Sequence, residues 1–238
     1  MKIAIATPFY EIKAYSPYIK SLISSIERLN EAGIGYEYLE LRGDPYVERA
    51  KNSLADQFLK SNCTHIFMID SDLSWEVDGF MKIIEIAKKG AEIVMGVFRT
   101  KGDTARYPVY PRRDKDGYFM GKEDLGLIQS TSLLGGFTVY SRQALERVIP
   151  HVGTYRDISM GEGAVGIDFH EFFKSRIRGD GERQGEDFYM GERFQEAGGT
   201  IWIEPNIDIT HWGIKGYKGN YHKHLLNKKA LSEIGVNK

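Results

Sequence analysis

The sequence predicts an α/β fold with a mostly parallel sheet, and two observations support this prediction. In the first hundred residues, short apolar runs alternate with longer segments whose apolar residues recur every three or four positions. This alternation is typical of strand–helix–strand units, in which the helices cover the faces of the sheet. With 238 residues, of which 42% are hydrophobic, the chain can also bury one sizeable core.

The elements of the first half follow from where each run begins and ends. The apolar runs stop at residues that favour turns, such as Thr7-Pro8 and Gly43-Asp44-Pro45, and the periodic segments keep their apolar residues on one helical face. In chain order, the sequence predicts a strand at 2–6, a helix at 15–32, a strand at 36–41, a helix at 46–60, a strand at 65–69, a helix at 75–89 and a strand at 92–98.

The second half has a different composition and fewer regular patterns. Residues 99–122 are basic and rich in proline, tyrosine and glycine, and residues 153–185 are rich in glycine and charge. We expect irregular segments there, which could close over a site as lids. The remaining elements expected are strand residues within 126–140, a helix at 141–148, a helix at 186–197, a strand at 200–204 and a basic, aromatic tail from 207 onward.

No repeat or linker divides the chain, so we expect a single domain over 1–238, with a nucleotide-binding half at 1–100 and an acceptor-binding, catalytic half at 101–238. The net charge of -1 argues against a surface that binds nucleic acid or membrane as a whole. Cys63 is the only cysteine, which excludes an internal disulfide and a multi-cysteine zinc site.

The expected location follows from the absence of long apolar runs. No such run approaches about 18 residues, and the N-terminus turns polar too early for a signal peptide. We therefore expect a soluble protein without membrane insertion, located in the cytoplasm, or in the host cytoplasm if it is viral. The oligomeric state stays open.

Two carboxylates follow the strand at 65–69. Asp70 and Asp72, separated by Ser71, come at the C-terminal end of a buried strand, where open α/β sheets bind ligands. If the chain stays extended, both side chains point the same way, which suits a divalent cation and a polyphosphate. A strand-to-turn boundary without function would favour the same residue types.

Further polar residues could belong to the same site. Arg49 and Asn52 share one helical face and could orient the carboxylates or meet a phosphate, unless they are simply solvated. Glu186 and Asp187 open a helix, where acidic residues are also common for electrostatic reasons. His211 could complete an oxygen-rich metal site, although a single histidine is more often structural.

Taken together and in this order, these features resemble the GT-A-fold, metal-dependent nucleotide-sugar glycosyltransferases, especially the small single-domain enzymes of bacteria, phages and large viruses. The resemblance covers most of the chain. It is carried by Thr7-Pro8, Arg49-x-x-Asn52-x-x-Ala55, the strand and Asp-x-Asp motif at 64–72, Leu134-Gly135-Gly136-Phe137, Gly185-Glu186-Asp187 and His211-Trp212-Gly213.

The resemblance implies a role for each part. Asp72 and His211 would bind Mn²⁺ or Mg²⁺, and Asp70 would serve the metal or the ribose. Asp187 would be the catalytic base of an inverting enzyme, with Glu186 as its substitute. The donor would be a nucleotide diphosphate sugar, by resemblance a UDP-sugar, and its contacts would come from Thr7, Pro8, Arg49, Asn52, Asp70, Ser71, Gly135, Gly136, Lys215 and Lys218.

Three alternatives stay open at this point. Retaining transfer needs no protein base. A non-catalytic module would bind the nucleotide sugar without using Asp187. A sugar-1-phosphate nucleotidyltransferase normally opens with a glycine-rich, basic loop, which residues 7–12 do not provide. The acceptor is also open: basic clusters within 99–115 and 176–183 could approach a glycan, a lipid-linked sugar or a modified nucleobase.

Overall fold

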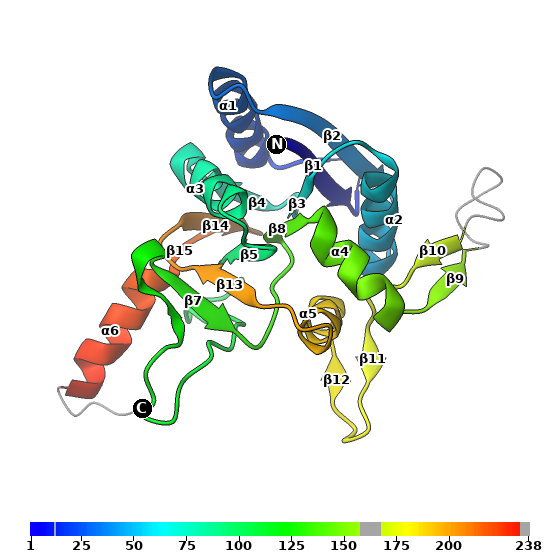
Figure 1. Ribbon diagram of the computed structural model, residues 1–238. Helices are drawn as coiled ribbons and strands as arrows, with labels where there is room; N and C mark the ends of the chain where they lie inside the picture. Colours follow the sequence, from blue (N-terminus) through cyan, green and yellow to red (C-terminus); the bar gives the residue numbers. More distant parts are fainter. Residues whose placement is uncertain (12, 158–167, 234–238) are drawn as a thin grey trace.

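The computed structural model describes residues 1–11, 13–157 and 168–233 (Figure 1). Within these residues, an eight-stranded sheet has the order β2-β1-β3-β8-β5-β13-β7-β6. Its strands are β1 (Lys2–Phe9), β2 (Gly35–Arg42), β3 (His65–Ile69), β5 (Ile93–Gly96), β6 (Gly121–Lys122), β7 (Leu127–Ser130), β8 (Phe137–Ser141) and β13 (Ile201–Glu204).

The directions of these strands confirm the predicted fold class. Strands β2, β1, β3, β5, β13 and β6 run one way, whereas β8 and β7 run the other way. The sheet is therefore mixed but mostly parallel. Strand β8 lies between β3 and β5 and runs antiparallel to both. Its amino end therefore lies at the same edge of the sheet as their carboxyl ends.

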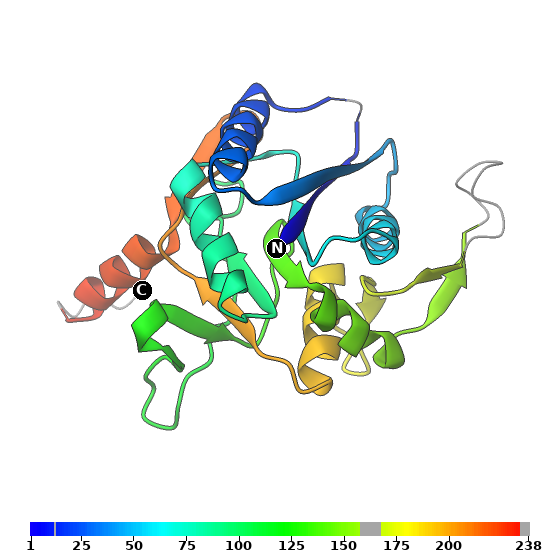
Figure 2. The same cartoon turned by 45° about the horizontal axis from the view of Figure 1, so that its top comes forward.

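Helices cover both faces of the sheet. In both views α1 and α3 lie together on one face, and α2, α4 and α5 lie on the other (Figures 1 and 2). The helices are α1 (Ser16–Glu31), α2 (Val47–Lys60), α3 (Val77–Lys88), α4 (Arg142–Val148), α5 (Glu186–Glu196) and α6 (Tyr221–Glu233), with short 3₁₀ helices η1 (Glu123–Leu125) and η2 (Ile149–His151).

The predicted helices of the first half begin and end within two residues of the observed ones. Strand β1, however, continues three residues past the predicted end, through Thr7-Pro8 to Phe9. The reason is that β1 pairs with β3 only as far as Ala6, so Pro8, which has no N–H to donate, lies where the strand has β2 alone beside it.

The tail was not predicted as regular structure, but it forms two strands and a helix. A second sheet of order β15-β14-β4 joins β4 (Leu73–Trp75), β14 (Asp208–Trp212) and β15 (Gly216–Asn220), and α6 follows β15. Two hairpins also interrupt the segment expected to be irregular at 153–185; residues 158–167 of that segment lie outside the described residues. The hairpins are β9 (Thr154–Arg156) with β10 (Asp168–His170), and β11 (Arg176–Ile177) with β12 (Arg183–Gln184).

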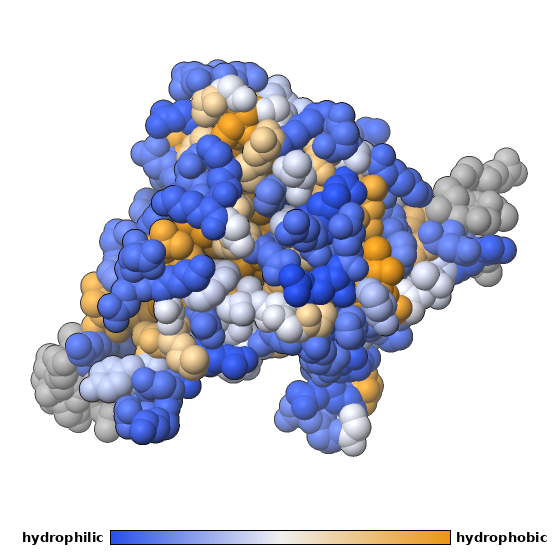
Figure 3. Space-filling view, viewed as in Figure 1, coloured by the Kyte–Doolittle hydropathy of each residue, from blue (hydrophilic) through white to orange (hydrophobic). Residues whose placement is uncertain are grey.

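On the face shown in Figure 3, the hydrophobic areas are small and separated by hydrophilic side chains. The large apolar side chains instead pack between the sheet and its helices, where Ile5, Phe67 and Phe137 are fully buried. In the part of the chain that the structure describes, no helix combines the length and the apolar character needed to cross a membrane.

Candidate active site

The two acids of the Asp-x-Asp motif are separated by a turn. The chain turns at Ser71 and Asp72, where the N–H of Leu73 donates to the carbonyl of Asp70 at 3.2 Å, and β4 begins directly afterwards. The segment does not stay extended, so the condition under which both side chains would point the same way is not met. As a consequence, Asp70 and Asp72 have different neighbours.

Asp72 lies beside His211. The register of β14 on β4 pairs His211 with Leu73, and the N–H of Trp212 donates to the carbonyl of Asp72 at 2.7 Å. This arrangement leaves Nε2 of His211 3.4 Å from Oδ2 of Asp72. The sequence-predicted pair of Asp72 and His211 is thus brought together by strands that lie far apart in the chain.

The second nitrogen of His211 has its own partner. Its Nδ1 lies 3.0 Å from the carbonyl oxygen of Arg99. Because a carbonyl only accepts hydrogen bonds, Nδ1 donates to it, and Nε2 is the ring atom that faces Asp72. A histidine oriented through its other nitrogen in this way is typical of a metal ligand.

The ammonium of Lys101 also contacts Asp72. Its Nζ lies 2.5 Å from the same Oδ2 atom. Burial would raise the pKa of Asp72, but the hydrogen bonds from His211 and Lys101 outweigh burial and hold this pKa below its usual value. Sequence reasoning placed Lys101 among the residues that could approach the acceptor, so its position at Asp72 was missed.

Asp70 contacts the glycine pair that precedes β8. Its N–H donates to the carbonyl of Gly136 at 2.9 Å. A Cβ atom on Gly136 would lie 2.3 Å from Oδ2 of Asp70, and a Cβ atom on Gly135 would lie 2.2 Å from Oδ1 of Asp187. The two glycines are therefore needed because both carboxylates lie directly against the backbone.

Asp187 is held from two sides. Its Oδ2 accepts from the N–H of Gly135 at 2.9 Å, and its Oδ1 lies 2.6 Å from Nζ of Lys51. The same ammonium lies 3.0 Å from Oε1 of Glu186. Thus α2, the start of α5 and the turn before β8 meet around the buried ammonium group of Lys51.

Lys51 was not identified from the sequence, although a signal was present. It lies on α2 at helical spacing with Leu54, Ala55 and Phe58, all buried, and only 2% of its side chain is exposed. A lysine on an apolar helical face must be paired to remain charged. Burial would lower the pKa of Lys51, but Asp187, Glu186 and Asp70 raise it well above its usual value.

The three carboxyl groups near Lys51 differ in pKa. For Asp70, burial is the largest effect, and although Lys51 opposes it, the pKa rises to about 6. Burial also raises the pKa of Asp187, only partly offset by Lys51. Burial is the largest effect on Glu186 too, but Lys51 outweighs it there and the pKa lies below its usual value. Of the two acids that open α5, Asp187 is the stronger base.

A pocket of about 170 Å³ lies beside this cluster at the carboxyl ends of β1 and β2. It is lined by Pro8, Phe9, Tyr10, Asp44, Pro45, Val47, Ala50, Asp70, Ser71 and Asp72. Of the residues that the resemblance assigned to nucleotide contacts, Pro8, Asp70 and Ser71 line this pocket. Thr7 does not line the pocket: its side chain is fully buried, and its hydroxyl bonds the Tyr18 hydroxyl at 2.5 Å.

Arg49 and Asn52 have partners other than the Asp-x-Asp carboxylates. The Arg49 guanidinium lies 2.6 Å from Asp44, which lines the pocket, and 3.3 Å from Asp157. Asn52 bonds the backbone of Phe173 through both atoms of its amide, at 2.8 and 3.0 Å. Arg49 therefore supports the pocket wall, and Asn52 fixes the segment after β10 to α2.

The two predicted tail lysines have different partners. Lys215 is in the turn between β14 and β15, where its Nζ lies 2.8 Å from Asp103. Lys218 pairs with Thr210 in the strand register, next to the pair of His211 and Tyr217. Since neighbouring positions of a strand face opposite ways, Lys218 is directed away from His211 and toward Asp208.

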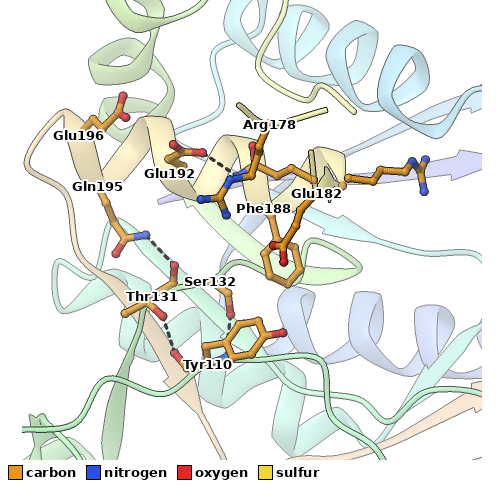
Figure 4. Close-up of a pocket in the computed structure, with 12 residues that line it drawn as sticks. Tyr110, Thr131, Ser132, Arg178, Glu182, Phe188, Glu192, Gln195 and Glu196 are labelled. Carbon is orange, nitrogen blue, oxygen red and sulfur yellow. Dashed lines mark hydrogen bonds between the residues drawn. The ribbon is translucent and has the colours of Figure 1, made fainter. Parts of the chain in front are cut away.

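A larger pocket of about 790 Å³ runs along α5 (Figure 4). On one side the rings of Tyr110 and Phe188 meet edge to face, with centroids 5.9 Å apart, and 62% of Tyr110 is exposed. The hairpin of β11 and β12 contributes Arg178 and Glu182, and α5 contributes Glu192 and other polar side chains. The pocket reaches Gly185, the residue before Glu186.

The close approach at Gly135 can be tested by substitution. Gly135→Ala should lower the free energy of unfolding by about 1–3 kcal/mol, because its Cβ would overlap Asp187 and displace it. Gly179→Ala is the matched control, since nothing lies within 4 Å of the added atom, and it should change the value by less than about 0.5 kcal/mol. Urea denaturation measures both. Equal stability of the two variants would contradict the contact.

Neither a family model nor a curated protein matches the sequence. Among solved structures, the chain is similar to A197 from STIV, with a TM-score of 0.51 and 19% identity over 90% of this chain and 86% of that chain. It is also similar to GalNAc-T7, solved with UDP, GalNAc and Mn²⁺, with a TM-score of 0.51 and 13% identity over 87% of this chain and 42% of that chain. At these identities the likeness concerns the fold, and it confirms a GT-A-like α/β architecture.

Proposed function

We propose that this protein is a metal-dependent glycosyltransferase that moves a sugar from a UDP-sugar to an acceptor hydroxyl with inversion. The observation that carries this proposal is the meeting of two groups at one edge of the sheet: Asp72 with His211, and Asp70 with Lys51 and Asp187. The GT-A-like fold and the Asp-x-Asp motif support it, and GalNAc-T7, with the same fold, was solved with UDP, GalNAc and Mn²⁺.

The donor set fits a hard divalent cation. Asp72 offers a carboxylate oxygen, and His211 offers an imidazole nitrogen oriented by Arg99. Among the described residues, no three side chains of His, Cys, Asp or Glu gather closely enough to form a metal site by themselves. Mg²⁺ and Mn²⁺ sites commonly keep substrate phosphates and water among their ligands, and a cation held here would offset the charge that develops on the leaving diphosphate.

The pocket at Pro8 and Ser71 is proposed to receive the nucleoside. Asp44 lies in its wall, and Arg49 together with the N–H of Tyr46, at 2.9 Å, keeps the Asp44 carboxylate in place. A fixed carboxylate can accept hydrogen bonds from hydroxyl or ring N–H donors. The proposed donor site therefore runs from this pocket toward Asp72.

Asp187 is proposed as the general base. As the acceptor oxygen forms a bond to the anomeric carbon, the proton of the acceptor hydroxyl passes to the Asp187 carboxylate and the diphosphate leaves with the electron pair of the broken C–O bond. Gly135 and Lys51 fix the carboxylate, and the charge of Lys51 partly offsets the effect of burial, which raises the pKa of Asp187. The anomeric configuration of the product separates this pathway from retaining transfer.

The pocket along α5 is proposed to bind a glycan acceptor. It lies next to the residues that precede Asp187, and its volume lies within the range of about 300–1,000 Å³ that is usual for ligand pockets. The exposed ring of Tyr110 and the half-buried ring of Phe188 offer apolar faces for sugar rings, while the surrounding carboxylates, amides and arginines can bond hydroxyl groups.

The proposed function predicts a cation-dependent reaction of the donor. With a panel of UDP-, GDP- and CMP-sugars, release of the nucleotide should be seen with a UDP-sugar and Mn²⁺, should stop with excess EDTA, and should return when Mn²⁺ is added. Asp72→Asn and His211→Ala should each be slower than the parent by roughly 100-fold or more, because each removes one of two proposed protein ligands. A full rate in excess EDTA, or tighter binding of GDP or CMP than of UDP by calorimetry, would contradict the proposal.

A further inference from the structure

We propose that Lys101 is a built-in counter-ion of the cation site, which holds Asp72 when no cation is bound and moves to the donor diphosphate when one binds. This inference rests on the proposed function. It assigns to Lys101 a role that follows neither from the Asp-x-Asp motif nor from the fold. It concerns a lysine in the loop after β5, outside the residues that the sequence assigned to the donor.

The contacts at Asp72 carry the first part of the proposal. Lys101 Nζ and His211 Nε2 approach the same carboxylate oxygen, at 2.5 Å and 3.4 Å. A divalent cation held by Asp72 and His211 would lie where the ammonium now neutralises the carboxylate. Two positive charges so close together repel each other strongly, so Lys101 must give up Asp72 before the cation can bind.

The loop that carries Lys101 is built to present it there. The N–H of Thr100 donates to the carbonyl of Arg106 at 2.9 Å, and the Arg99 guanidinium donates to the carbonyl of Gly102. A Cβ atom on Gly213 would lie only 3.2 Å from Cδ of Lys101, so the bare backbone of Gly213 leaves room for the lysine stem.

The side chain is also free enough to move. Lys101 is 38% exposed, in contrast to the buried Lys51, and its four-carbon stem lets the ammonium rotate without a change of the backbone. The diphosphate of a donor bound to the cation would be within the same site and would attract the released ammonium. Lys218 faces away from His211, and Lys215 contacts Asp103, so of these three lysines it is Lys101 that contacts a residue of the proposed cation site.

The test measures binding of Mn²⁺ itself, with no turnover involved. In Lys101→Met without nucleotide, the affinity for Mn²⁺, followed by the electron paramagnetic resonance signal of the free ion, should rise roughly ten-fold, as expected for losing one competing charge-assisted hydrogen bond. With saturating Mn²⁺, calorimetry should show that the affinity for UDP falls roughly ten-fold, because one phosphate contact is lost. Thermal unfolding of the variant checks that it folds.

Lys115→Met is the matched control, because it removes an equal charge from an exposed lysine of the same basic segment. Both affinities should stay within about two-fold of the parent, since a screened surface charge has little effect at a distance. Mn²⁺ affinity that is unchanged or weaker in Lys101→Met would overturn the proposal, as would unchanged UDP affinity. Absence of Mn²⁺ binding in the parent and in Lys101→Met alike would instead contradict the cation site of the proposed function, and the role of Lys101 with it.

Discussion

Asp187→Asn should lower kcat by roughly 10²–10⁴-fold, the usual contribution of a general base. The amide cannot accept the proton of the acceptor hydroxyl, but it is nearly isosteric with the carboxylate. UDP affinity in the presence of Mn²⁺ should stay within about a few-fold of the parent, because the contacts proposed for the cation and nucleotide belong to other residues. Steady-state rates with the active UDP-sugar and calorimetry with UDP measure the two quantities.

The contact with Lys51 changes the expected effect of this substitution on stability. A helix-start aspartate without further partners would lose about 1 kcal/mol or less when replaced by asparagine. Here the amide also meets the buried ammonium of Lys51, which keeps Glu186 as its partner. We therefore expect a loss of about 1–3 kcal/mol in the free energy of unfolding, measured by urea denaturation.

Glu186→Gln is the matched control for Asp187→Asn, because it removes the other carboxylate on Lys51. It should keep most of the turnover. If Glu186→Gln is inactive while Asp187→Asn transfers at a near-normal rate, the base is Glu186. If both variants stay active, the inverting assignment fails. A parallel loss of UDP binding and turnover in Asp187→Asn would instead indicate that Asp187 holds the cation.

Lys51→Met should lower the free energy of unfolding by about 3–5 kcal/mol at neutral pH, the usual effect of removing one partner of a buried ion pair. The methionine fills a similar volume but leaves Asp187 and Glu186 without their counter-charge. Lys60→Met is the matched control: Lys60 is exposed at the end of the same helix, and its loss should cost about 1 kcal/mol or less.

The pH dependence of this loss follows from the raised carboxyl pKa values. Without Lys51, the pKa values of Asp187 and Asp70 in the folded state should rise further, and the pKa of Asp70 is already about 6 in the parent. A carboxyl group whose pKa is raised in the folded state destabilises the fold fully above that pKa, and the effect fades as the pH falls from there toward the ordinary carboxyl pKa of about 4. The difference from the parent should therefore be largest near about pH 8 and shrink toward about pH 5. A difference that is constant or grows as the pH falls would contradict the buried ion pair.

Much of the fold could be predicted from the sequence, because strands and helices that cover a core leave a local pattern. The helix over Ser16–Glu31 and the strand over His65–Ile69 are examples in which apolar spacing and flanking turn residues suffice. Strand β14 and helix α6 were missed because their local pattern is weak. The side chains of β14 are mostly half-exposed, and α6 has no continuous apolar face.

The sequence by itself determined which residue types stand next to the ends of strands and helices. These are the two acids after β3, the glycine pair before β8, the acids that open α5 and a histidine late in the chain. Only the tertiary structure decided which of them meet. The turn at Ser71 directs Asp72 to His211 and Lys101, while Asp70 and Asp187 lie on the Gly135-Gly136 backbone near Lys51. These contacts join segments that are more than a hundred residues apart in some pairs, such as Lys51 and Asp187. The register of the strands, and the carboxylates that a buried lysine meets far along the chain, determine these contacts, and neither is encoded in the short-range spacing of residues.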